Sequence, residues 1–132
     1  MGYEEGLDAR DATGMAHAGA AQGSPLRSIY FEFDAYSLRA DAQESLRHNA
    51  QLLRDNPDWR IRIEGNCDER GSDEYNLALG KKRAEAAKDY LIDLGVDSSR
   101  IATISYGEEN PAAQGSDEMA WSRNRRDDFV MR

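Results

Sequence analysis

The sequence is poor in cysteine, in histidine and in long apolar runs, and each shortage excludes a class of protein. Its 132 residues contain one cysteine, Cys67, which excludes an internal disulfide and a zinc site built on several cysteines. The two histidines, His17 and His48, fall in a tail and in a predicted helix, so we expect no Cys–His catalytic pair. No run of about 18 apolar residues is present, which predicts no membrane-spanning helix, and no signal peptide is recognisable.

Basic side chains are also in the minority. Seventeen lysines and arginines face 25 aspartates and glutamates, giving a formal net charge of −8. A nucleic-acid-binding protein would present a basic face to the phosphates, and adsorption to an anionic membrane needs a basic face too. We therefore expect no nucleic-acid partner, whereas a small ligand held by a few local charges stays possible.

Residues 1–26 differ in composition from the rest and predict a flexible tether. Gly, Ala, Asp and Glu dominate from Gly2 to Gly23, where Leu7 and Met15 are the only sizeable aliphatic side chains. So little apolar surface would not offset the entropy cost of ordering the chain. Residues 27–132 are enough for one domain with its own core.

Apolar residues alternate along some segments, as in strands, and recur at helical spacing along others. Ile29, Phe31 and Phe33 alternate with polar residues, which places all three on the buried side of a half-buried strand. The expected elements, in chain order, are a strand at 29–34, a helix at 41–56, a strand at 59–64, a helix at about 72–94 ended by Gly95, a strand at 101–106, a short helix at 119–125 and a strand at 128–131. The order β-α-β-α-β-(α)-β predicts an α/β fold: a two-layer sandwich with a mixed four-stranded sheet and helices on one face.

Two opposite charges mark the segment from Gly65 to Ala84. In the long helix, Arg83 interrupts the apolar stripe that includes Leu79 and Ala87. Periodicity alone leaves two interpretations open: an arginine whose stem packs while its head reaches water or a carboxylate, or a positive charge held at the rim of a cleft.

Asp68 precedes the same helix and also has two interpretations. In the structural interpretation, Asp68 caps the helix or pairs with Arg70. In the functional one, it binds a ligand ammonium while the planar guanidinium of Arg83 donates hydrogen bonds to a ligand carboxylate. Asp34, at the end of the first predicted strand, would join Asp68 if both strands end at one edge. A pair of nearby carboxyl groups is also what a glycosidase site requires. Such a site needs a deep groove, for which this domain has little room, so we expect no enzyme.

The C-terminal run Trp121-Ser122-Arg123-Asn124-Arg125-Arg126 is a basic cluster in an acidic chain. We interpret it as a solvated helix end, where cations lie near the negative end of the helix dipole.

Several motifs, in this order, resemble the OmpA-like peptidoglycan-binding domain, and most of all its branch of peptidoglycan-associated lipoproteins. The motifs are Tyr30-Phe31-Glu32-Phe33-Asp34, the segment Glu64–Gly71, the segment Tyr75–Ala84, the segment Ile104–Pro111 and the run Trp121–Arg126. The resemblance covers about Ser28 to the end of the chain. Asn66 stands where the family often has histidine; it keeps a hydrogen-bonding side chain but does not titrate near neutral pH.

The resemblance implies a periplasmic domain that binds the peptide stem of peptidoglycan without covalent chemistry, cofactor or metal. In the family, the residues at the positions of Asp68 and Arg83 hold the ammonium and carboxylate of diaminopimelate. By the same resemblance, further residues would line the pocket: Asp34, Glu69, Arg70, Asn76 and Leu79.

The resemblance also implies partners. Lipoproteins of this branch bind TolB and work with other Tol proteins, through a surface that overlaps the peptidoglycan site, and a lipidated N-terminal cysteine anchors them in the outer membrane. This chain has no N-terminal cysteine, so such an anchor would lie outside it. Two alternatives stay open: a module chiefly for TolB, or the wall-binding domain of another family member.

Overall fold

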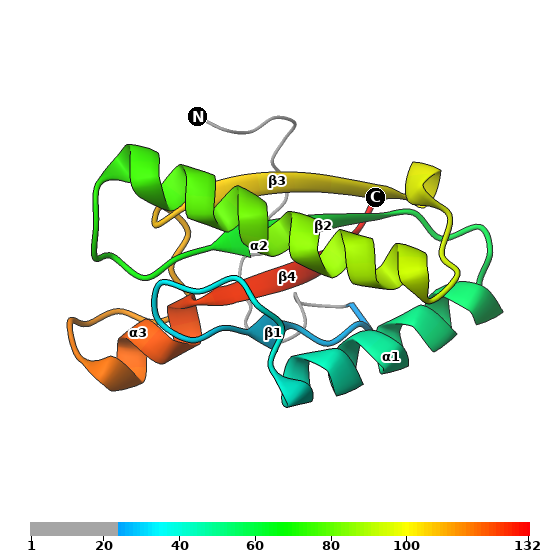
Figure 1. Cartoon of the computed structure of the whole chain (residues 1–132), viewed down its shortest axis with the longest axis horizontal. Coiled ribbons are helices and arrows are strands. Elements are labelled where there is room, and N and C mark those ends of the chain that lie inside the picture. Colours follow the sequence, from blue (N-terminus) through cyan, green and yellow to red (C-terminus); the bar gives the residue numbers. More distant parts are fainter. Residues whose placement is uncertain (1–23) are drawn as a thin grey trace.

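The computed structural model describes residues 24–132, which form one mixed sheet with helices packed against it (Figure 1). The elements in chain order are β1 (Ile29–Tyr30), α1 (Ala40–Asp55), β2 (Ile61–Asn66), α2 (Asp73–Asp93), the 3₁₀ turn η1 (Ser98–Arg100), β3 (Ile101–Gly107), α3 (Glu118–Asn124) and β4 (Arg126–Met131). Up to residue 23, the predicted tether lies outside the described residues. Leu26, also placed in the tether, is fully buried, so packing begins before residue 27.

The four strands lie in the order β1-β4-β2-β3. β2 and β3 are parallel, whereas β4 runs antiparallel to both β1 and β2, which confirms the predicted mixed sheet. The helices α1 and α2 pack against the face that presents Ile61, Ile63 and Phe129, and their buried residues join these in a single core (Figure 1). The predicted α/β sandwich with helices on one face is therefore confirmed.

Helix α1 buries the stripe that its periodicity predicts, which consists of Ala42, Leu46, Asn49, Ala50 and Leu53. The Asn49 side chain also makes two hydrogen bonds to the backbone of Arg27. Its Oδ1 accepts a hydrogen bond from the backbone nitrogen of Arg27 at 2.8 Å, and its Nδ2 donates to the carbonyl of Arg27 at 2.9 Å. A buried amide thus satisfies both backbone groups of the residue that leads into β1.

Helix α2 begins and ends as its sequence predicts. The Ser72 side chain accepts a hydrogen bond from the backbone nitrogen of Tyr75, and Gly95, with φ +101°, follows the last turn. The helix approaches β2 closely where two glycines meet. A Cβ atom on Gly65 would lie 1.9 Å from the carbonyl oxygen of Gly80. This contact places the first half of α2, and with it Leu79 and Arg83, against the end of β2.

The first strand is shorter than its alternation predicts. It pairs with β4 only at Ile29 and Tyr30, followed by a hydrogen bond from Phe31 N to the carbonyl of Arg125 at 3.0 Å. The chain then turns, so Phe33 is 54% exposed and the prediction that it points into the core is wrong. Asp34 has φ 56°, a left-handed conformation that a strand does not contain.

No helix within residues 24–132 combines the length and the apolar character that a membrane crossing requires.

Candidate functional site

A pocket of about 220 Å³ lies among the turn after β1, the turn after β2 and the first half of α2. Its lining residues are Phe33, Asp34, Cys67, Asp68, Arg70, Gly71, Tyr75, Asn76, Leu79 and Arg83. Six of the seven predicted site residues are in this lining, and the seventh, Glu69, is not. The structure therefore brings together residues from three separate motifs around one pocket.

Arg83 reaches the pocket from α2 and is 1% exposed. Its guanidinium donates three hydrogen bonds to backbone carbonyls: Nε to Ala35 at 2.8 Å, Nη1 to Asn66 at 3.0 Å and Nη2 to Glu32 at 3.1 Å. Both interpretations of Arg83 need correction, because its charge neither reaches bulk water nor lies at a rim. It is a buried part of the wall, and burial lowers its pKa.

The three carbonyl bonds fix the Arg83 guanidinium in one orientation. A guanidinium carries five N–H donors, so two are left for another acceptor. The Phe31 ring packs on the same group, with its centroid 5.1 Å from Cζ of Arg83. The positive charge is thus held by backbone dipoles, and no carboxylate among residues 24–132 forms an ion pair with it.

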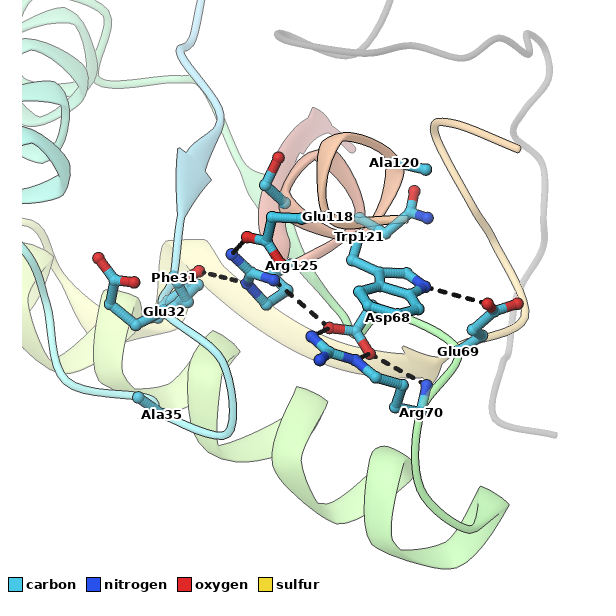
Figure 2. Close-up of polar contacts among 12 residues, drawn as sticks. Phe31, Glu32, Ala35, Asp68, Glu69, Arg70, Glu118, Ala120, Trp121 and Arg125 are labelled. Atoms are coloured by element: carbon cyan, nitrogen blue, oxygen red, sulfur yellow. Dashed lines mark hydrogen bonds and ion pairs between the residues drawn. The ribbon is translucent and has the colours of Figure 1, made fainter. Parts of the chain in front are cut away.

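Asp68 directly follows the β2–β3 pairing and is 4% exposed. Its Oδ1 accepts from the backbone nitrogen of Arg70 at 3.0 Å, and Oδ2 accepts from Nη2 of Arg70 at 2.8 Å (Figure 2). Nη1 of Arg125 lies 3.6 Å from Oδ2. Burial alone would raise the pKa of Asp68, but the bonds from Arg70 and the charge of Arg125 outweigh it and hold the pKa below its ordinary value.

Of the two structural interpretations of Asp68, the pairing with Arg70 is therefore the one observed, and Ser72 caps the helix. Arg70 itself is held between two aromatic rings. Its Cζ lies 3.9 Å from the ring centroid of Phe33 and 4.0 Å from that of Trp121, both within cation–π range. This stack joins the turn after β1, the turn after β2 and helix α3 around the Asp68 carboxylate.

Glu69 lies on the outer side of this stack and is exposed. Its Oε2 accepts a hydrogen bond from Nε1 of Trp121 at 3.0 Å (Figure 2). Hydrogen bonds from Ser116 and Trp121 lower the pKa of Glu69. Glu69 thus contacts the α3 side of the site, and in this structure it supports Trp121 instead of lining the pocket.

Cys67 and Asn76 form the inner end of the pocket lining. The Cys67 thiol donates to the carbonyl of Asn76 at 3.2 Å, and burial raises the pKa of this thiol to about 11. The side-chain nitrogen of Asn76 donates to Oε1 of Glu108. The thiol is therefore protonated at neutral pH and packs as a small apolar group, without the thiolate that nucleophilic chemistry needs.

The sequence hypothesis missed two aromatic residues of the site, Phe33 and Tyr75. Phe33 was placed in the core by its alternation with Ile29 and Phe31. The Tyr75 hydroxyl donates a hydrogen bond to Oδ1 of Asp34, which links the first turn of α2 to the turn after β1. Its position one helical turn before Leu79 was a usable signal, because both residues then face the same side of the helix.

The interpretation of the C-terminal cluster as a solvated helix end is wrong for its last two arginines. Arg125 is 4% and Arg126 is 2% exposed. Arg125 donates from Nε to the carbonyl of Phe31 at 2.8 Å and from Nη2 to Glu118 at 3.0 Å (Figure 2). Nε of Arg126 lies 3.1 and 3.0 Å from the two carboxylate oxygens of Asp128. The reason is that α3 ends at Asn124 and β4 begins at once, which carries both side chains into the protein.

Besides Nη1 of Arg125, two buried side chains among residues 24–132 have oxygen atoms without a hydrogen-bond partner. Both carboxylate oxygens of Asp127 and Oδ1 of Asn66 are unpaired. Burial raises the pKa of Asp127 well above its ordinary value, and the charge of Arg83 opposes this rise only in part. Asn66 stays attached by donating from Nδ2 to the carbonyl of Glu64 at 3.0 Å.

The arrangement is that of a small site for a ligand with both charges. Asp68, in the turn after β2, and Arg83, on α2, supply a carboxylate and a guanidinium to the same pocket, and Leu79 supplies apolar surface between polar groups. Among residues 24–132, no cluster of histidine, cysteine, aspartate or glutamate side chains is placed to hold a metal ion.

Comparison with known proteins supports the family that the sequence motifs resemble, the OmpA family. The sequence profile of the OmpA family matches residues 30–125. The peptidoglycan-associated lipoprotein of Mesorhizobium japonicum is 48% identical over 119 residues, which cover 88% of this chain and 71% of that protein. The peptidoglycan-associated lipoprotein of Agrobacterium fabrum is 52% identical over 98 residues, 74% of this chain and 55% of that protein. The chain thus spans between about half and three quarters of these relatives.

Solved structures agree with these matches. The crystal structure of the peptidoglycan-associated lipoprotein from Burkholderia pseudomallei has a TM-score of 0.78 and 49% identity, covering 80% of this chain and 90% of that one. The C-terminal domain of Helicobacter pylori MotB has a TM-score of 0.74 at 21% identity, covering 80% of this chain and 83% of that one, and this likeness concerns the fold alone.

Proposed function

The chain belongs to the OmpA family, and from this membership and the charges of its pocket we propose that it binds the peptide stem of peptidoglycan without cleaving it. The observation that carries the proposal is the pair Asp68 and Arg83, opposite charges fixed by different elements in the wall of one pocket of about 220 Å³. The relatives named as peptidoglycan-associated lipoproteins support the choice of ligand.

The ligand group that fits best is the diaminopimelate of the stem, whose free end carries an ammonium and a carboxylate. The ammonium binds Asp68, either beside the Arg70 guanidinium or in its place. The carboxylate accepts the two N–H groups of Arg83 that the backbone carbonyls do not use. The methylene chain of the ligand packs on Leu79, and Asp34, Asn76 and Arg70 supply the remaining polar wall.

Substitution of Asp68 tests this proposal. Asp68→Asn keeps the size of the side chain but removes its charge, and we expect it to weaken binding of meso-diaminopimelate and of purified cell wall by about 2–5 kcal/mol, or at least roughly 30-fold. The measurements are calorimetric titration and co-sedimentation with wall. Asp89→Asn is the matched control, because Asp89 is exposed on α2 and is not among the residues lining the pocket.

A thermal melt of each variant separates loss of the site from loss of the fold. Arg83 is less suitable as the first target, since two of its carbonyl bonds also hold the turn after β1 and the third holds the end of β2. If folded Asp68→Asn sedimented with cell wall as well as the unchanged protein does, the proposal would be wrong.

The protonation state of Asp68 argues against its use as the general acid of a hydrolase. A glycosidase acid needs a raised pKa so that it carries a proton at the working pH. The pKa of Asp68 is instead lowered by its hydrogen bonds from Arg70, despite the opposing effect of burial. We therefore assign Asp34 and Asp68 to ligand binding; release of soluble fragments from purified wall by this protein would contradict that assignment.

A protein partner at the mouth of the pocket is the second candidate function. Four large side chains are exposed near the site: Phe33 at 54%, Tyr36 at 49%, Tyr75 at 51% and Met119 at 73%. Aromatic residues and methionine are enriched in protein interfaces. We propose TolB as this partner, with its surface overlapping the wall site. Titration of TolB in the presence of saturating wall peptide checks this, and unchanged TolB affinity would exclude a shared surface.

These assignments define a place in the cell envelope. The wall ligand lies in the periplasm of a Gram-negative bacterium, and the relatives are named as lipoproteins. We propose that the domain tethers the outer membrane to the wall together with the Tol proteins, with a lipid anchor of the kind that the names of the relatives indicate.

A further inference from the structure

A second, smaller pocket adjoins the first along α2. It has a volume of about 80 Å³ and is lined by Asp34, Tyr36, Tyr75, Ala78, Leu79 and Lys82. Asp34, Tyr75 and Leu79 line both pockets, so one wall separates them. Tyr36 and Lys82 line only the smaller pocket, and neither is assigned to the diaminopimelate group above.

The shared wall presents a hydrogen-bond acceptor. The Tyr75 hydroxyl donates to Oδ1 of Asp34 and holds that carboxylate at the boundary between the pockets. Within the described part of the chain, Oδ2 of Asp34 has no hydrogen-bond partner. The wall can therefore accept one N–H group from a ligand that passes from the larger pocket into the smaller one.

The far side of the smaller pocket presents a positive charge. The Lys82 ammonium lies 5.3 Å from the centroid of the Tyr36 ring. This cation–π contact restrains a side chain that is otherwise exposed. Among residues 24–132, no carboxylate lies within ion-pair distance of this ammonium. The charge is thus positioned but not neutralised, and a ligand carboxylate would neutralise it.

An acceptor on one side and a cation on the other match the polarity of a C-terminal amino acid, whose amide N–H precedes its carboxylate. Resting on the proposed function, we propose that the smaller pocket binds the residue that follows the diamino acid in the wall peptide, with its terminal carboxylate on Lys82 and its N–H on Asp34. With a volume of about 80 Å³, the pocket is the smaller of the two, so we take a residue with a small side chain, alanine, for the test.

Three synthetic peptides test the proposal by calorimetric titration of the full 132-residue chain. The first is γ-D-glutamyl-meso-diaminopimelate, the second adds a C-terminal D-alanine, and the third is the C-terminal amide of the second. We expect the second peptide to bind more tightly than the amide. Lys82→Gln should remove that advantage, a loss of about two- to five-fold, as for an exposed ion pair. Raising the salt concentration should also reduce the advantage in the unchanged protein.

Lys81→Gln is the matched control, because Lys81 is the exposed neighbour of Lys82 on α2, carries the same charge and lines neither pocket. The proposal is overturned if Lys82→Gln leaves the affinity for the second peptide unchanged, if it weakens all three peptides equally, or if Lys81→Gln has the same effect. Binding of the first peptide reports separately on the proposed function. If that peptide binds and the C-terminal carboxylate adds nothing, only the second subsite is wrong.

Discussion

Asp127 is completely buried, and neither of its carboxylate oxygens has a hydrogen-bond partner. No other buried carboxyl in the described part of the chain has a buried oxygen without such a partner. The neighbours of Asp127 in the sheet are Ile29 and Gly65, neither of which offers a polar side chain. Because burial raises its pKa well above 3.8, the folded state keeps a proton that the unfolded chain releases near pH 4. Stability should therefore depend on pH through this residue.

The sign of that dependence follows from linkage. Below pH 4 the carboxyl is protonated in both states and contributes nothing. As the pH rises from about 4 toward the raised pKa, the unfolded state loses its proton first, so the free energy of unfolding falls, by at most about 1.4 kcal/mol per pH unit. Asp127→Asn removes this term, so its stability relative to the unchanged protein should improve from pH 4 to pH 7. Denaturant titrations across that range measure it, and parallel curves for the two proteins would contradict it.

At the residue scale, sequence reasoning found Arg83 because a charge interrupts an apolar stripe, but it did not find what holds that charge. The three carbonyl acceptors belong to Glu32, Ala35 and Asn66, and no periodicity predicts backbone acceptors. The stack on Arg70 was missed for a related reason. Trp121 lies 51 positions from Arg70, a separation that only the folded chain removes.

At the element scale, α1 and α2 were predicted closely because apolar residues recur at helical spacing in both, and α2 also has clear end signals in Ser72 and Gly95. The strand at 29–34 was predicted too long, because alternation does not reveal the left-handed backbone of Asp34. That turn is part of the site, since it carries Phe33 and Asp34 to the pocket. The prediction failed where the chain leaves regular structure to build the pocket.

The contact between β2 and α2 gives a test at this scale. In Gly65→Ala the new Cβ would meet the carbonyl oxygen of Gly80 at 1.9 Å, so the helix has to move away from the strand. We expect the free energy of unfolding to fall by about 1–3 kcal/mol, the usual cost of overpacking. Because Arg83 would move with the helix, affinity for the wall peptide should fall as well.

Gly95→Ala serves as the control for Gly65→Ala. A Cβ atom on Gly95 meets no atom within 4 Å, but its φ of +101° disfavours alanine. This variant should lose stability through backbone strain while its affinity for the wall peptide is unchanged. Equal affinity of Gly65→Ala and the unchanged protein would show that the glycine contact does not position the pocket.

At the scale of the whole molecule, composition separated the chain into a tether and a domain at residue 26, whereas packing in the structure already includes Leu26. The Ser24 hydroxyl accepts a hydrogen bond from the backbone nitrogen of Leu26 at 3.1 Å, and the Leu26 side chain joins the core formed by β1 and α1. Composition cannot locate such a boundary. One leucine among polar residues changes the average hydropathy of the segment little, yet it contributes a fully buried side chain to the core.

Two truncated chains test where the domain begins. A protein comprising residues 24–132 should match the full chain in melting temperature and in affinity for meso-diaminopimelate, because it keeps Leu26. A protein comprising residues 27–132 should lose about 2–5 kcal/mol of unfolding free energy, the range for removing a buried leucine side chain, and keep its affinity where it is folded. Thermal melts and calorimetric titrations of both proteins provide the comparison. If both truncated proteins were as stable as the full chain, burial of Leu26 would not contribute to the domain, and the composition boundary at residue 26 would stand.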